Sequence, residues 1–243
     1  MSFRSDPEFP HSITERSQAA QVELFQSLFA DYSNFGLTDV TDRPIAIDSL
    51  AMALAKAFNT NVKYGIFKRY LHRSLLWQRS QDIPMRRIFY AAGKTPPSWS
   101  WMTYHGQIEY SKIQGVEWDK GVRFVKAINA ASNPENDGYV LEARVRRFQD
   151  CEIKPEGTKH VIRDQNDNNV GYLCFDIQLE KASIEVQCAI MGRGIIGEEG
   201  KRRYYVLFVT ECVTQPECGK FERLGMGWIQ QRFILFDRQD DVV

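Results

Sequence analysis

Gly93-Lys94-Thr95-Pro96-Pro97-Ser98 separates two kinds of sequence pattern. Before this segment, apolar residues recur at the three- and four-residue spacing of a helix, whereas after it apolar and polar residues alternate with the period of a strand. Gly, Pro and Ser interrupt regular structure, so the segment predicts the main internal boundary of the chain. We therefore expect an α+β protein in which a helical region, residues 13–92, packs as one unit with a β-rich region, residues 93–243.

Three helices are expected in the N-terminal third. Apolar residues share one face over residues 22–29, and a longer apolar stripe covers residues 44–58, where a proline suits the first turn of a helix. A third helix is predicted over residues 64–77. Residues 1–12 carry two prolines among charged residues and are predicted to form a flexible arm.

The β-rich region is expected to hold seven or eight strands. Residues 204–209 are apolar on both faces, which predicts a central or covered strand. Turn residues separate the strands and no helical pattern lies between them, so we expect a mainly antiparallel barrel, closed or nearly closed, or a sandwich. The predicted strands cover residues 107–113, 122–128, 139–145, 158–163, 170–177, 184–190 and 204–209.

The charged residues balance, with 31 Lys and Arg against 31 Asp and Glu. A chain without an overall positive field is not drawn to nucleic acid, so no nucleic-acid binding is predicted. No apolar run approaches the roughly 20 residues needed to cross a bilayer, and the N-terminus lacks the apolar core of a signal peptide. The five cysteines are an odd number and favour reduced thiols. We predict a cytoplasmic protein without a membrane span.

A glycine-rich pattern at residues 192–197 fits the G-x-G-x-x-G of dinucleotide sites. Such a site needs a helix directly after the glycines, so that the helix N-terminus faces the phosphates. Here a strand is predicted next, which favours a hairpin loop. Cys212 and Cys218 have no second pair of Cys or His at the spacing of a zinc site. We predict neither a cofactor nor a metal ion.

Five residues are candidates for a site. His105, at a predicted turn, and Asp176, in a predicted strand, are the catalytic candidates because both can act as acids or bases. Trp99, Trp101 and Tyr104 are the ligand-binding candidates, since an extended chain would place both indoles on one side. The competing interpretations are a salt-bridged or solvated carboxylate and tryptophans that hold the helical region against the β-rich region.

Four stretches of the chain together resemble a known family. Leu75-Leu76-Trp77, followed by Pro97-Ser98-Trp99-Ser100-Trp101, is similar to the "LLW … PSWSW" signature of fungal heterokaryon-incompatibility (HET) proteins. Residues 31–46 resemble the helical "YS…LT…D…A" part of that signature, and Phe221-Glu222-Arg223-Leu224-Gly225-Met226-Gly227 resembles its "YERxGxG" segment. The likeness is to the C-terminal region of these proteins and spans most of the sequence.

The resemblance implies a role in self/non-self recognition without a known reaction. The family's N-terminal HET domain, which is similar to TIR domains, has no counterpart in this sequence, so NAD cleavage is not expected. The family commonly continues its signature as "SWAS-D-G", whereas residues 101–106 read Trp-Met-Thr-Tyr-His-Gly. This departure makes residues 102–105 the first place to look for a site.

Two functions from different classes remain open. The first is a stand-alone HET C-terminal-like module that binds or restrains a protein partner. The second is a cofactor-independent cyclase or isomerase of fungal secondary metabolism, with an apolar small molecule held inside the barrel and acid/base side chains acting on it. The sequence leaves open whether the protein is an enzyme.

Overall fold

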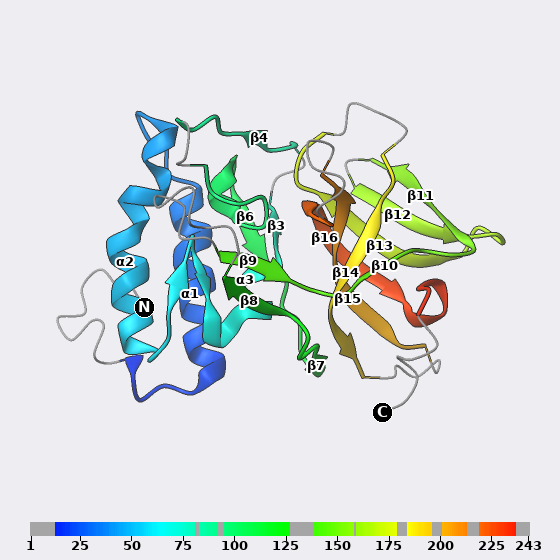
Figure 1. The fold of residues 1–243 in the computed structure, drawn as a ribbon, viewed down its shortest axis with the longest axis horizontal. Helices are drawn as coiled ribbons and strands as arrows, with labels where there is room; N and C mark the ends of the chain where they lie inside the picture. Colours follow the sequence, from blue (N-terminus) through cyan, green and yellow to red (C-terminus); the bar gives the residue numbers. More distant parts are fainter. Residues whose placement is uncertain are drawn as a thin grey trace.

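The fold is α+β, with helices on one side and a large antiparallel sheet on the other (Figure 1). The predicted arm, residues 1–12, lies outside the described residues. No helix in the part of the chain that the structure describes is long and apolar enough to cross a membrane. The computed structural model describes residues 13–80, 83–91, 95–126, 139–157, 159–178, 184–195, 201–212 and 219–236.

Two of the three predicted helices are confirmed, α1 (Gln18–Ser33) and α2 (Arg43–Ala57). The Ser17 hydroxyl accepts from the backbone N–H of Ala20 at 3.3 Å, which satisfies one of the free amides at the start of α1. Short 3-10 turns flank the longer elements. These are η3 (Val40–Asp42), η4 (Lys68–Tyr70), η5 (Trp101–Thr103) and η8 (Gln231–Phe233).

The third predicted helix is wrong in its first half. Residues 64–67 belong to a hairpin of β1 (Val62–Lys63) and β2 (Ile66–Phe67), and α3 covers only Leu71–Leu75. The turn of this hairpin requires positive φ at Tyr64 and Gly65, which a helix does not allow. Apolar spacing predicted the buried face correctly, but the turn geometry decided the backbone.

Three two-stranded ribbons lie between the helices and the main sheet. Strands were predicted at the positions of β6, β8 and β9, whereas the short strands β3, β4 and β5 were not. The pairs are β3 (Trp77–Arg79) with β6 (Ile108–Tyr110), β4 (Arg86–Arg87) with β5 (Tyr104–His105), and β8 (Arg123–Lys126) with β9 (Tyr139–Glu142).

The main sheet has eight antiparallel strands. Its order is β10-β14-β15-β16-β13-β12-β11. β10 and β7 both pair with β14, β10 at residues 188–189 and β7 farther along the strand at residues 192–194. Among the described strands this path is open, with β10 and β11 at its ends, so the sheet does not close into a barrel. The bounds are β7 (Val116–Trp118), β10 (Val145–Arg146), β11 (Cys151–Glu156), β12 (Lys159–Asp164), β13 (Asn169–Phe175), β14 (Gln187–Gly194), β15 (Arg203–Glu211) and β16 (Phe221–Gln230).

Both faces of the sheet are buried at its central strand β15. In β15, Val206 and Phe208 point into one apolar cluster, while Leu207 and Val209 point into a second cluster that includes α3 and the 97–101 segment. The prediction of a central strand at residues 204–209 is therefore confirmed, since β15 lies between β14 and β16. The second cluster forms the interface between the sheet and the helical side.

Candidate functional site

A buried ion pair between Arg223 and Asp176 lies at this interface. Arg223 belongs to β16, Asp176 directly follows β13, and both side chains are 1% exposed. Arg223 donates through Nε to Asp176 Oδ2 at 2.8 Å and through Nη2 to Asp176 Oδ1 at 3.2 Å. Two bonds of this kind fix the plane of the guanidinium. The ion pair is thus a geometrically defined point inside the molecule.

The same guanidinium also holds the end of α3. Its Nη1 donates to the carbonyl of Leu75 and its Nη2 to the carbonyl of Trp77, each at 2.6 Å. The guanidinium carbon lies 3.5 Å from the centroid of the Trp77 ring, a cation–π contact. One side chain of the sheet therefore binds the backbone on both sides of Leu76.

The segment at residues 97–101 joins the same junction. Ser98 Oγ accepts from the backbone N–H of Arg223 at 3.2 Å, and the Trp77 indole donates to the carbonyl of Trp99 at 3.1 Å. Residues 75–77, 97–101 and 221–227, far apart in the sequence, are therefore in direct contact around one ion pair. We call this set of contacts the Arg223 junction.

Asp176 is held by its backbone as well as by its carboxylate. Its N–H donates to the carbonyl of Leu224 at 2.8 Å, and its own carbonyl accepts from Met85 N at 2.9 Å. Burial raises the pKa of the Asp176 carboxyl, while the positive charges of Arg223 and Arg79 oppose that rise. Any substrate approaching this carboxylate would have to displace the Arg223 guanidinium.

The glycine-rich end of the 221–227 segment has a packing role. A Cβ on Gly227 would overlap the carbonyl oxygen of Tyr172 on the neighbouring strand β13. Gly227 therefore allows β13 and β16 to approach closely beside the Arg223 junction.

The two tryptophans lie in different apolar clusters. The expectation that both indoles lie on one side is wrong, because a backbone turn from Pro97 to Ser100 and then η5 interrupt the extended chain. Trp99 packs with the sheet and contacts the Phe124 ring at 5.4 Å. Trp101 is fully buried among the helices and contacts the Phe29 ring at 5.5 Å. Together they hold the helical side against the sheet.

A second buried arginine supports the segment after Trp101. Arg43 is 2% exposed and donates to the carbonyls of Tyr104 at 2.6 Å, Ser33 at 2.7 Å and Gly106 at 3.4 Å. Its guanidinium also lies 5.2 Å from the Trp101 ring centroid. Burial lowers the pKa of Arg43, and no carboxylate of the described residues forms an ion pair with it. Carbonyl oxygens and an indole ring solvate this charge instead.

Tyr104 and His105 are neighbours with opposite surroundings. Tyr104 is buried and packs on Trp77 with ring centroids 5.8 Å apart. Burial raises the pKa of its hydroxyl, and the nearby Asp176 charge adds to that rise. His105 is exposed and lies opposite Arg86 in the β4–β5 ribbon. His105 is thus on the surface and Asp176 is in the interior, and no contact among the described residues joins them.

The arrangement is suited to holding two halves of a protein together. Asp176, Trp99, Trp101 and Tyr104 contact other side chains or backbone of the chain itself. Sequence reasoning missed the role of Arg223, which it treated only as part of a motif. A signal was available, because Arg223 adjoins an apolar glycine-containing stretch and Asp176 adjoins another. Charged side chains buried within such stretches are rarely without a partner.

The comparisons with known proteins add no name to this geometry. A search of protein-family models, of curated proteins and of solved structures found no match to the chain. Within the described ranges, no three His, Cys, Asp or Glu side chains come together in a group that could hold a metal ion. The function is therefore argued from the molecule itself.

Proposed function

We propose that this protein is a cytoplasmic binding module, similar to the C-terminal region of HET proteins, that recognises a protein partner in fungal self/non-self recognition. The family resemblance rests on four segments of the sequence, and three of them, residues 75–77, 97–101 and 221–227, meet at the Arg223 junction. Residues that define the contact between the two sides of a fold are the ones a family with that fold would share. The junction therefore gives the resemblance a physical meaning.

The observation that carries the proposal is the burial of the candidate site residues. Trp101 and Asp176 are 0% exposed, and Asp176 is bound in an ion pair. Large apolar side chains are instead exposed at the surface, where Phe89 is 89% and Ile195 77% exposed. Contiguous apolar patches are typical of protein-binding surfaces, and an exposed ring such as that of Phe89 could contribute to one when a partner covers it.

The alternative, a cofactor-independent cyclase or isomerase, has less support. It needs an acid or base that faces a bound ligand. Asp176 is bound to Arg223 through both carboxylate oxygens, and His105 is on the surface. The binding module requires no rearrangement of these groups.

The test is affinity purification of the tagged full chain from fungal cells, followed by reconstitution with purified components. We expect at least one protein that is recovered above the tag-only background and binds the purified chain directly. In parallel, the chain is incubated with extracts of apolar fungal metabolites, which are then separated by chromatography and mass spectrometry. Absence of any direct protein partner, together with a metabolite whose retention time changes only in the presence of the chain, would replace the binding module by the enzyme.

A further inference from the structure

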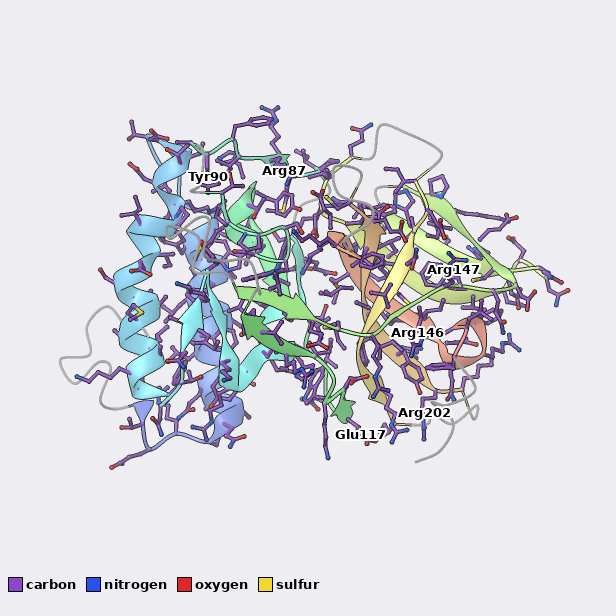
Figure 2. All side chains as sticks on the ribbon, in the orientation of Figure 1. Arg87, Tyr90, Glu117, Arg146, Arg147 and Arg202 are labelled. Atoms are coloured by element: carbon purple, nitrogen blue, oxygen red, sulfur yellow. The ribbon has the colours of Figure 1, made fainter. Side chains whose placement is uncertain are left out.

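The two edges of the β4–β5 ribbon differ in how far the described residues occupy them. On the β5 side, the carbonyls of Tyr104 and Gly106 accept from Arg43, so this edge is bound to the helical side of the molecule. On the other side of the ribbon, β4 runs along the surface between the helices and the main sheet, and Figure 2 shows Arg87 and Tyr90 at this margin of the molecule. Any further strand could therefore be added only at β4.

The amides of β4 alternate between the two edges. Ile88 N donates to the carbonyl of Thr103 at 2.9 Å, and Arg86 is paired with His105. The backbone amides of the even-numbered residues therefore face β5. The backbone amides of the odd-numbered residues consequently face away from β5. The first of them, Met85, donates to the carbonyl of Asp176 at 2.9 Å. No carbonyl of the described residues accepts from the next two, Arg87 and Phe89.

The side chains along this edge are basic and apolar. Arg86 and His105 lie directly opposite each other and both are exposed, so two groups that can carry positive charge share one face. Arg87 Nη1 lies 3.5 Å from Glu222 Oε2, and the two side chains are 42% and 41% exposed. Phe89 is 89% exposed. The chain as a whole has equal numbers of acidic and basic residues. Arg86 and Arg87 therefore form a local excess of positive charge beside the exposed Phe89 ring.

We propose that the outer edge of β4 binds an extended acidic segment of a partner protein by strand addition. The partner's backbone bonds to Arg87 and Phe89, its carboxylates lie beside Arg86 and His105, and an apolar side chain covers Phe89. Strand addition of this kind takes its affinity from backbone bonds and its specificity from side chains. A second copy of this chain is disfavoured as the occupant, because pairing two β4 edges would bring four arginines together. The inference rests on the proposed binding function and names its surface.

The test begins with a random dodecapeptide display library selected on the full chain. We expect enriched peptides to carry Asp or Glu with apolar residues between them. A synthetic enriched peptide, labelled with a fluorophore, then measures Kd by anisotropy. Arg86→Glu should weaken binding on the order of tenfold, because it replaces an attractive charge by a repulsive one. The charge-reversal control Lys112→Glu, in an exposed segment outside the ribbon, should leave Kd unchanged.

Two substitutions at one position separate strand addition from simple charge attraction. Arg87→Ala removes the charge, whereas Arg87→Pro removes the charge and the outward amide. Proline is tolerated where the amide faces away from the ribbon, so both variants should unfold near the wild-type temperature. Loss of one backbone bond predicts that Arg87→Pro binds about three- to tenfold more weakly than Arg87→Ala. Equal affinities for the two variants would overturn strand addition.

Other outcomes also decide the proposal. Enriched peptides without acidic residues, an unchanged Kd in Arg86→Glu, self-association through β4 seen by light scattering, or binding to phosphatidylserine vesicles in place of peptides would each overturn it. If a partner from fungal cells binds wild type and Arg86→Glu equally, the surface is wrong while the binding function stands. If no partner is recovered at all, the binding function itself fails.

Discussion

The Arg223 junction and the β4–β5 ribbon use the same residue type in opposite ways. At the junction, a guanidinium is buried and each of its nitrogens donates to a carboxylate or carbonyl oxygen. On the ribbon, Arg86 is exposed opposite His105. A buried charge contributes to stability only through its partners, whereas an exposed charge remains available to another molecule. We therefore expect substitutions at the Arg223 junction to change stability and substitutions on the ribbon to change binding.

The largest expected effect comes from removing the junction's charge. Arg223→Met leaves the Asp176 carboxylate buried without a partner and frees two carbonyls of the α3–β3 turn, so the free energy of unfolding should fall by about 3–5 kcal/mol. Urea unfolding followed by tryptophan fluorescence measures the change. Arg123→Met, which breaks the exposed pair of Arg123 with Glu142, is the matched control and should leave the free energy of unfolding close to that of the wild type.

A double variant sharpens this result. In Arg223→Met with Asp176→Leu neither charge of the ion pair is left, so part of the lost stability should return. If the double variant is less stable than Arg223→Met alone, the junction acts mainly through the hydrogen bonds to Leu75 and Trp77 and not through the ion pair.

A smaller effect is expected from Gly227→Ala. The added methyl group overlaps the carbonyl oxygen of Tyr172, so β13 and β16 must separate at a cost of about 1–3 kcal/mol. Gly194→Ala in β14 is the control, because its Cβ would meet its nearest neighbours at 3.5 Å, an ordinary contact distance. Equal stabilities of the two variants in thermal unfolding would contradict the close approach at Gly227.

The free energy of unfolding should also depend modestly on pH, through a histidine at the interface between α3 and the sheet. His72 of α3 donates through Nε2 to the carbonyl of Asp119 and stacks on Trp118 at 5.3 Å. Burial lowers the pKa of His72 below its usual 6.5. The unfolded chain therefore binds the proton more readily, and the contribution of neutral His72 is present above pH 6.5 and is lost as pH falls through the folded-state pKa. Between pH 7 and 5, His72→Gln should lose stability less steeply than wild type in urea unfolding.

The smallest effect on stability is expected at the ribbon. Arg86→Gln removes one of two opposed basic groups on an exposed face, so the free energy of unfolding should change by no more than about 0.5 kcal/mol. Differential scanning calorimetry checks this value. A loss comparable to that of Arg223→Met would show that the ribbon is part of the structural core, and the division between the two regions would not hold.

Periodicity predicted the elements whose environment is set locally. Residues 204–209 were expected to be a central strand, and β15 is one, because a continuous apolar run reports burial on both faces. The strand predicted at residues 139–145 is divided between β9 and β10, which pair with different partners. β11 was missed because Pro155 and its charged neighbours mask the pattern of an edge strand.

The candidate site was less accessible to sequence reasoning. Asp176 was identified as a carboxylate of interest, and a salt bridge was one of the interpretations considered for it. Its partner lies 47 residues away on another strand, and no spacing rule connects them. His105 and Asp176 were paired as catalytic candidates although one is exposed and the other buried, because sequence patterns do not report which side of a short ribbon faces solvent.

The sequence by itself determined the α+β class, two of the helices and four of the eight strands of the main sheet, β12, β13, β14 and β15. These follow from backbone preferences and apolar spacing, which act over a few residues. Tertiary structure alone decided that three motifs meet at Arg223, that two tryptophans separate into different clusters, and that the amides of Arg87 and Phe89 have no carbonyl partner among the described residues. Such features depend on contacts between residues distant in the chain, and their energies depend on burial, which a linear sequence does not contain.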